Sequence, residues 1–163
     1  YRRQRQMCIR DRYNFGTDQN NWSPGANRIT LKYSEKTTVI WKLDNDQYSR
    51  FIADGYAPNT DAVAHNFITR DGYEDILQSP TVVVIQGPLY NDEATTLPSV
   101  LTVGVGPVTI FHEGKYIEGT WRRNDISDPF EFLDTNQNKI DVPPSKQWIH
   151  LLPLNGEITI SDN

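Results

Sequence analysis

The sequence contains very little sulfur. Its single cysteine, Cys8, and its single methionine, Met7, both lie within the first twelve residues. One cysteine cannot form a disulfide within the chain, and residues 13–163 offer no thiol for nucleophilic or redox chemistry. This composition is compatible with an oxidising, extracytoplasmic compartment without requiring one. Long apolar runs are also absent, and no stretch approaches the ~18 consecutive apolar residues of a transmembrane helix.

The first twelve residues, YRRQRQMCIRDR, differ in composition from the rest of the chain. They hold five arginines and one aspartate, and they are similar to the peptide that results when sequencing-adapter DNA is translated with a gene fragment. We interpret residues 1–12 as a non-native scar; the alternative is a disordered basic arm for nucleic acid or anionic lipid. The whole chain has 16 basic and 21 acidic residues, so 11 basic and 20 acidic residues remain without this segment, a net charge of −9. Such an acidic surface disfavours nucleic-acid binding, because it repels phosphate backbones.

The stretch from Val103 to Trp121, VGVGPVTIFHEGKYIEGTW, is typical of a β-hairpin. Apolar and polar residues alternate before Glu113-Gly114, where glycine can adopt the positive φ of a tight turn. With these two residues as the loop, Phe111 faces Tyr116. Trp121 then falls on the face of Val108, Ile110 and Ile117, beside two glycines that leave room for its indole, and we expect this face to be buried in the core.

Short apolar segments elsewhere predict further strands. The run TVVVIQ (81–86) is continuously apolar up to its last residue, which is typical of a central strand buried on both faces. Other strands are expected over 29–33, 37–43, 48–53, 100–105, 130–132, 140–142, 147–152 and 156–160. A polar loop is expected over 87–99. Turn residues and a capping box, Asp71 followed by Glu74, favour short helices near 60–78, one turn over 60–66 and a helix over 72–78.

The length of 163 residues fits one domain. Residues 13–28, rich in Asn, Gly, Pro and Ser, are interpreted as an irregular linker whose aromatic residues pack down in part. Residues 29–163 then form a single mainly β domain, with α+β as the alternative. We expect antiparallel sheets arranged as a sandwich or a partly open barrel, with one or two short helices.

Several of these segments together resemble one family. They are ITLKYS (29–34), WKLDND (41–46), YSRF (48–51), TVVVIQ, the VGVG strand, FHEGKYIEGTWRR (111–123) and the closing FEFLDTNQNKI…QWIHLLP (130–153). The pattern resembles the C-terminal domain of the YerB-like family of predicted bacterial lipoproteins, whose function is unknown. The resemblance covers roughly residues 13–153.

The resemblance implies an upstream N-terminal domain as the first partner of this domain. It also implies a signal peptide with a lipidated cysteine, and residence at the outer face of the cytoplasmic membrane with the lipid anchor as the only membrane contact. The family supplies no established activity, catalytic residue or cofactor.

No local motif in the sequence predicts a catalytic or metal site. The three histidines, His65, His112 and His150, are not paired with other ligands at a metal-binding spacing. Asp134-Thr135-Asn136-Gln137-Asn138 imitates the start of a calcium loop, but Lys139 replaces the required glycine and Ser145 replaces the final glutamate, so a β-turn is favoured. The sequence has no G-x-S-x-G motif, and among 20 acids in residues 13–163 none can be singled out. We therefore predict no catalytic residue, no metal and no cofactor.

Aromatic and arginine residues give the candidate ligand-binding positions. Phe111 and Tyr116 face each other on the second face of the hairpin, where they either pack under another layer or form an aromatic platform for a sugar ring or a partner. Tyr48 belongs to the same set of strand aromatics. Arg50 and Arg122 are candidates for pairing with carboxylates, either in structural ion pairs or in anion binding.

These observations predict a non-enzymatic cell-envelope module that binds a cell-wall glycan or an envelope protein. One alternative is an enzyme that acts on glycan or peptide of the cell wall, with a site shared with the upstream domain. A second alternative is a purely structural domain.

Overall fold

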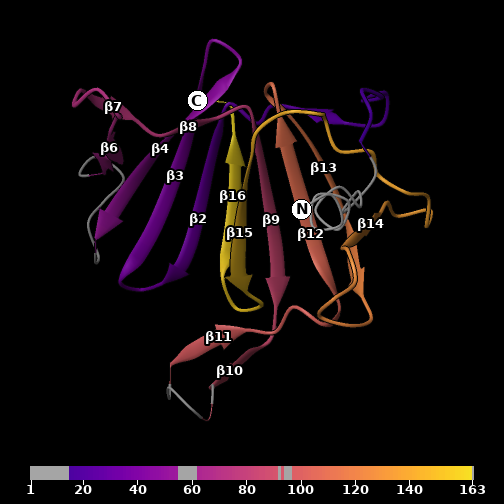
Figure 1. The fold of residues 1–163 in the computed structure, drawn as a ribbon. Helices are drawn as coiled ribbons and strands as arrows, with labels where there is room; N and C mark the ends of the chain where they lie inside the picture. Colours follow the sequence, from indigo (N-terminus) through magenta and orange to yellow (C-terminus); the bar gives the residue numbers. More distant parts are fainter. Residues whose placement is uncertain (1–14, 55–61, 92, 94–96, 163) are drawn as a thin grey trace, which may run out of the picture.

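The computed structural model describes residues 15–54, 62–91, 93 and 97–162, and the regular structure of these residues consists of strands (Figure 1). The first six-stranded sheet has the order β1 (Ser23–Pro24), β13 (Lys115–Arg123), β12 (Gly104–His112), β9 (Thr81–Gly87) and β15 (Gln147–Pro153), with β14 (Glu131–Leu133) paired to β13. The second has the order β16 (Glu157–Ser161), β2 (Arg28–Ser34), β3 (Thr37–Asp44), β4 (Gln47–Asp54) and β5 (Val63–Ala64), with β8 (Gln78–Ser79) paired to β4. The expected β-rich, sandwich-like fold is confirmed. The described residues include no helix long and apolar enough to cross a membrane.

The hairpin of β12 and β13 has the predicted register. Phe111 pairs with Tyr116, and Gly106 pairs with Trp121. Glu113 and Gly114 in the turn both have positive φ, 48° and 76°. Strand β9 lies between β12 and β15, and its first five residues, Thr81–Ile85, are all buried, as expected for a central strand.

Two apolar clusters cover the two faces of the first sheet. The cluster between the sheets joins Val82, Val84 and Phe111 to residues of the second sheet such as Leu31 and Trp41. The cluster on the opposite face is closed over β9, β12 and β13 by β14, by the segment that follows it and by the chain before β1. Its members are Trp22, Val83, Ile85, Val108, Ile110, Trp121, Phe132, Ile140 and Val142. The first sheet is therefore the buried centre of the molecule.

The segment 13–28, expected to be a linker, contributes to the fold over its described part. Trp22 and Ala26 are buried, and β1 pairs with the start of β13. The pairing of β15 with β9 is parallel, whereas only antiparallel strands had been expected. Parallel neighbours arise here because the chain between them crosses β12, β13 and β14 before it returns to the other side of β9.

The expected helix over 72–78 is wrong. Glu74–Ile76 form β7, which pairs with β6 (Asn66–Ile68) in a small separate hairpin. Thr69 accepts a hydrogen bond from the Tyr73 amide through its hydroxyl, and Tyr73 is 75% exposed. Leu77 packs in part against the cluster between the sheets while Tyr73 stays exposed, so the segment lacks the continuous buried apolar face that stabilises most helices of this length. The expected helical turn over 60–66 is also wrong where the structure describes it: Val63–Ala64 form β5, and residues 60 and 61 lie outside the described residues.

The region expected to be a polar loop contains a second small hairpin. Strands β10 (Leu89–Asn91) and β11 (Pro98–Val100) pair with each other and extend away from the two main sheets, at the bottom of Figure 1. The strand expected over 100–105 is interrupted at residues 101–103, and β12 begins only at Gly104.

We expect Gly119→Ala to lower the free energy of unfolding by about 1–3 kcal/mol, because the new methyl group overpacks the contact between β13 and β14. A Cβ at Gly119 would lie 2.2 Å from the carbonyl oxygen of Leu133 and 2.9 Å from Cδ1 of Ile140. The carbonyl belongs to the backbone of β14, so relief requires that strand to move. Urea unfolding measures the effect. The exposed neighbour Glu118 is the control, and equal losses for Glu118→Ala and Gly119→Ala would contradict the prediction.

Candidate functional site

A groove of about 620 Å³ lies where four segments of the chain meet. Its sides are formed by the chain before β1, the turn between β12 and β13, the start of β9 and the proline-rich turn before β15. The lining residues are Thr17, Gln19, Asn20, Pro80, His112, Glu113, Lys115, Pro143, Pro144 and Ser145. Each segment is fixed by its own strand, so the groove is formed without a ligand.

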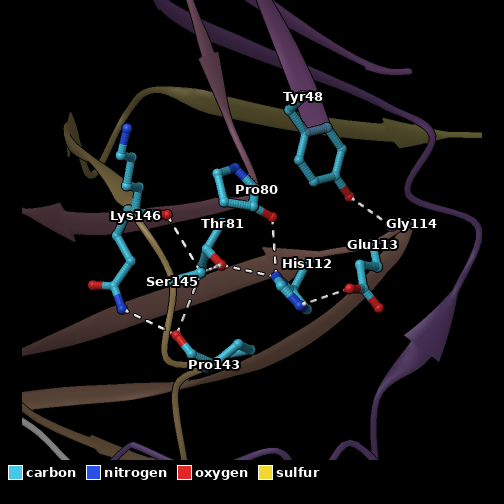
Figure 2. Close-up of polar contacts among 10 residues, drawn as sticks. Tyr48, Pro80, Thr81, His112, Glu113, Gly114, Pro143, Ser145 and Lys146 are labelled. Carbon is cyan, nitrogen blue, oxygen red and sulfur yellow. Dashed lines mark hydrogen bonds and ion pairs between the residues drawn. The ribbon is translucent and has the colours of Figure 1, made fainter. Parts of the chain in front are cut away.

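A chain of hydrogen bonds joins these segments at the floor of the groove (Figure 2). Ser145 Oγ lies 2.7 Å from Thr81 Oγ1, which in turn lies 2.8 Å from His112 Nδ1. The same nitrogen lies 3.0 Å from the carbonyl oxygen of Pro80, and His112 Nε2 lies 3.3 Å from Glu113 Oε1. The Pro80 carbonyl and the Glu113 carboxylate can only accept hydrogen bonds, so a ring that carries protons on both nitrogens donates to both.

In this chain of hydrogen bonds, no accessible hydroxyl contacts the imidazole of His112 directly, so the chain does not pair a nucleophile with a base. Thr81, the hydroxyl next to His112, is fully buried and cannot reach a substrate. Ser145 is only partly buried, but Thr81 stands between it and the imidazole. Activation of a hydroxyl nucleophile requires that it contacts its base directly. The rim, in contrast, is open: Glu113 and Lys115 are exposed and carry opposite charges.

Tyr48 holds the hairpin turn that forms one side of the groove. Its hydroxyl donates to the carbonyl oxygen of Ala26 at 2.9 Å and accepts from the Gly114 amide at 3.1 Å. Burial raises the pKa of Tyr48 to about 12, with the Gly114 amide acting in the opposite direction. The side chain is fully buried, so Tyr48 fixes the hairpin turn to the second sheet.

Phe111 and Tyr116 lie together, as the register predicted. Their ring centroids are 6.1 Å apart with an interplanar angle of 30°. Phe111 is fully buried, and Tyr116 packs against the cluster between the sheets. Of the two arrangements considered from the sequence, the structure has the pair packed under a second layer, and Phe111 offers no exposed ring face.

The two candidate arginines have different surroundings. Arg122 on β13 forms two hydrogen bonds to Glu131 Oε2 on β14, at 2.9 and 2.6 Å, and the pKa of Glu131 is lowered mainly by these bonds. Arg122 is thus in a structural ion pair. Arg50 on β4 lies over the ring of Trp148, 5.2 Å from its centroid, and contacts His65 Nδ1 through Nη1.

Two further candidates from the sequence, His150 and the turn that begins at Asp134, lie apart from the groove. His150 is buried between the sheets and bonds to Tyr33 and Trp41. Asp134 Oδ1 accepts from the amides of Asn136 and Asn138, both at 2.8 Å, so the favoured turn is confirmed for this segment. Within the described residues, no group of three or more His, Cys, Asp and Glu side chains is arranged to hold a metal ion.

Sequence reasoning missed Thr81 and Ser145. Thr81 begins an apolar strand and Ser145 follows two prolines, and neither position carries a local motif. The two hydroxyls are 64 residues apart in the chain and meet because the parallel pairing of β15 with β9 aligns the starts of both strands. No signal in the sequence could have predicted that contact.

Comparison with solved structures finds a protein of similar fold. The crystal structure of the YerB protein from Bacillus subtilis is similar with a TM-score of 0.62 and 13% sequence identity; the match covers 90% of this chain and 46% of that chain. The present chain therefore spans less than half the length of that structure. A search of curated proteins finds no match. The family model of the C-terminal domain of a protein of unknown function, DUF3048, matches residues 29–149. By this match over most of its length, the chain belongs to the DUF3048 C-terminal domain family.

Proposed function

We propose that this domain is a non-catalytic recognition module of the bacterial cell envelope, which binds a polar segment of a cell-wall or protein partner in the groove beside His112. The observation that carries the proposal is the combination of a fixed floor and a charged, exposed rim. The hydrogen bonds from Ser145 through Thr81 to His112 hold the floor, and the exposed side chains of Glu113 and Lys115 form the rim, where Glu113 Oε1 lies 3.3 Å from His112 Nε2. Preformed sites with a few placed polar groups are typical of ligand binding.

The groove suits a ligand with both donors and acceptors. Glu113 offers a carboxylate, Lys115 offers an ammonium group, and Gln19 and Asn20, which also line the groove, carry side-chain amides. Muropeptides carry hydroxyls, amides, amines and carboxylates and therefore match this lining. The family resemblance found in the sequence supports the envelope location, with a lipid anchor and an upstream domain as parts of the full-length protein. That upstream domain is the second partner in the proposal.

Binding of defined muropeptides to the purified domain tests the proposal. We expect saturable binding by calorimetry, weakened about tenfold by Glu113→Gln or Lys115→Gln, because each change removes a charge-assisted hydrogen bond. Lys36→Gln, in the exposed turn between β2 and β3, is the matched control and should bind as the wild type does. If neither muropeptides nor purified envelope proteins bind, or if the rim variants bind unchanged, the proposal fails.

The enzymatic alternative makes a different prediction in the same experiment. An enzyme would convert the muropeptide, and the products would be detected by mass spectrometry after long incubation with the full-length protein. Because Thr81 is buried and separates Ser145 from His112, we expect no conversion. Conversion that is abolished by a single aspartate or glutamate substitution would replace the recognition proposal with the enzymatic one.

A further inference from the structure

A second polar cluster, separate from the His112 groove, lies at the inner face of the second sheet. It contains Tyr33 on β2, Trp41 on β3 and Arg50 on β4, with His150 on β15 against them. His65, just after β5, faces Arg50. None of these residues lines the groove described above. The donors and acceptors of this cluster can be assigned one by one.

The hydrogen bonds of His150 fix its tautomer. The indole N–H of Trp41 can only donate, and it lies 2.8 Å from His150 Nε2. Nε2 is therefore unprotonated, and a neutral ring carries its proton on Nδ1. That proton is donated to the Tyr33 hydroxyl oxygen, 2.6 Å away. The hydroxyl hydrogen of Tyr33 must then point elsewhere, and the described part of the chain gives it no acceptor.

The same reasoning applies to His65. The guanidinium of Arg50 can only donate, so His65 Nδ1 accepts from Arg50 Nη1. A neutral His65 ring then carries its proton on Nε2, on the side of the ring that faces away from Arg50. Burial and the nearby charge of Arg50 both lower the pKa of His65, in agreement with a neutral ring.

The guanidinium of Arg50 also carries a hydrogen-bond donor that lacks an acceptor among the described residues. Its Nε is buried and has no hydrogen-bond partner among the residues that the structure describes. No carboxylate among the described side chains forms a hydrogen bond or ion pair with its guanidinium, which rests on the ring of Trp148. The positive charge of Arg50 acts to lower the pKa of Tyr33 and the pKa of His150, so both side chains lie within the electrostatic influence of the guanidinium. A buried donor without an acceptor is destabilising, and the oxygen of a bound anion would supply the acceptor.

We propose that Arg50, together with Tyr33, forms a binding site for a small oxyanionic group, a carboxylate or a phosphate, beside His65. The guanidinium supplies the charge and a fork of donors that matches either group. The ring of Trp148 packs against the guanidinium and fixes its position. The hydrogen bonds from Trp41 to His150 and from His150 to Tyr33 fix the orientation of the Tyr33 hydroxyl. The site does not depend on the proposed recognition of a partner by the His112 groove.

The imidazole NMR signals of His65 report directly on this site. Sodium phosphate, sodium acetate and sodium chloride are titrated separately into the purified domain at matched ionic strength. We expect phosphate or acetate to raise the pKa of His65 in a saturable manner, because a bound anion favours the imidazolium, whereas chloride gives only gradual screening. The salt that saturates identifies whether the ligand is a phosphate or a carboxylate.

Arg50→Gln should weaken the saturable response at least tenfold, because it removes the charge and the fork. Arg122→Gln is the matched control: its guanidinium already pairs with Glu131 in the other sheet, and it should respond as the wild type does. If Arg50→Gln does not fold, Arg50→Lys and Tyr33→Phe replace it, and each should weaken binding several-fold. The proposal is overturned if phosphate and acetate both follow the chloride curve, or if the Arg50 and Tyr33 variants respond as the wild type does.

Discussion

Trp121→Ala is expected to lower the free energy of unfolding by about 3–5 kcal/mol, the range for removal of a fully buried large aromatic side chain. The indole is 1% exposed and meets the ring of Phe130 edge-on, with centroids 5.7 Å apart. Its N–H also donates to the carbonyl oxygen of Gln86 at 2.7 Å. The substitution therefore opens a cavity and leaves a partly buried carbonyl without its donor. Equilibrium unfolding in urea measures the change.

Two variants separate the causes of that loss. Trp121→Phe keeps most of the buried ring but lacks the N–H, so it should cost less than the alanine variant. Ile126, which is 71% exposed in the turn after β13, is the control, and Ile126→Ala should change stability by about 0.5 kcal/mol at most. The assignment of Trp121 to the core is wrong if Trp121→Ala and Ile126→Ala have equal effects.

Acidification is expected to remove about 4–5 kcal/mol of stability through His150 alone. Burial, and to a smaller extent the charge of Arg50, lowers the pKa of His150 to about 3 in the folded protein. In the unfolded chain a histidine has a pKa of about 6.5. The unfolded state therefore binds the proton first as the pH falls, so the contribution of His150 is complete above about pH 6.5 and is lost progressively down to about pH 3. Each unit of difference corresponds to about 1.4 kcal/mol.

Unfolding measured from pH 7 to pH 3 in the wild type and in His150→Gln checks this expectation. The amide of glutamine can still accept from Trp41 but does not titrate, so the stability of the variant should depend less steeply on pH. Carboxylates such as Glu131 lose stabilising interactions over the acid end of this range in both proteins and cancel in the comparison. His65→Gln is the matched control and should leave most of the pH dependence in place, because His65 lies near the surface. Parallel curves for the wild type and His150→Gln would contradict the prediction.

The strands could be predicted because their pattern is local. Alternation in β12 and β13, with a Glu113-Gly114 turn between them, determines both the hairpin and its register, since a slip of one residue would turn Trp121 out of the core. The helix expected over 72–78 failed because the capping pattern of Asp71 and Glu74 is equally compatible with a turn. A short helix forms only where a packed apolar face supports it, and here Leu77 packs against the core while Tyr73 is exposed.

The candidate sites could not be predicted, because each depends on contacts between distant segments. Arg50 and Arg122 look alike in the sequence, yet Arg122 meets a carboxylate of β14, and Arg50 lies on Trp148. The difference arises from which strand lies beside each arginine. Phe111 and Tyr116 were placed opposite each other from the sequence, but only the second sheet decides that the pair is covered.

The sequence by itself determined the β-rich class, the hairpin register and the central position of β9, because period-two patterning and turn residues act between near neighbours in the chain. The tertiary structure alone decided the parallel return of β15 beside β9 and the stacking of the two sheets. Those two features bring Ser145 to Thr81 and His150 to Trp41. Hydrogen bonds between residues so far apart depend on the path of the whole chain, and no local pattern encodes that path.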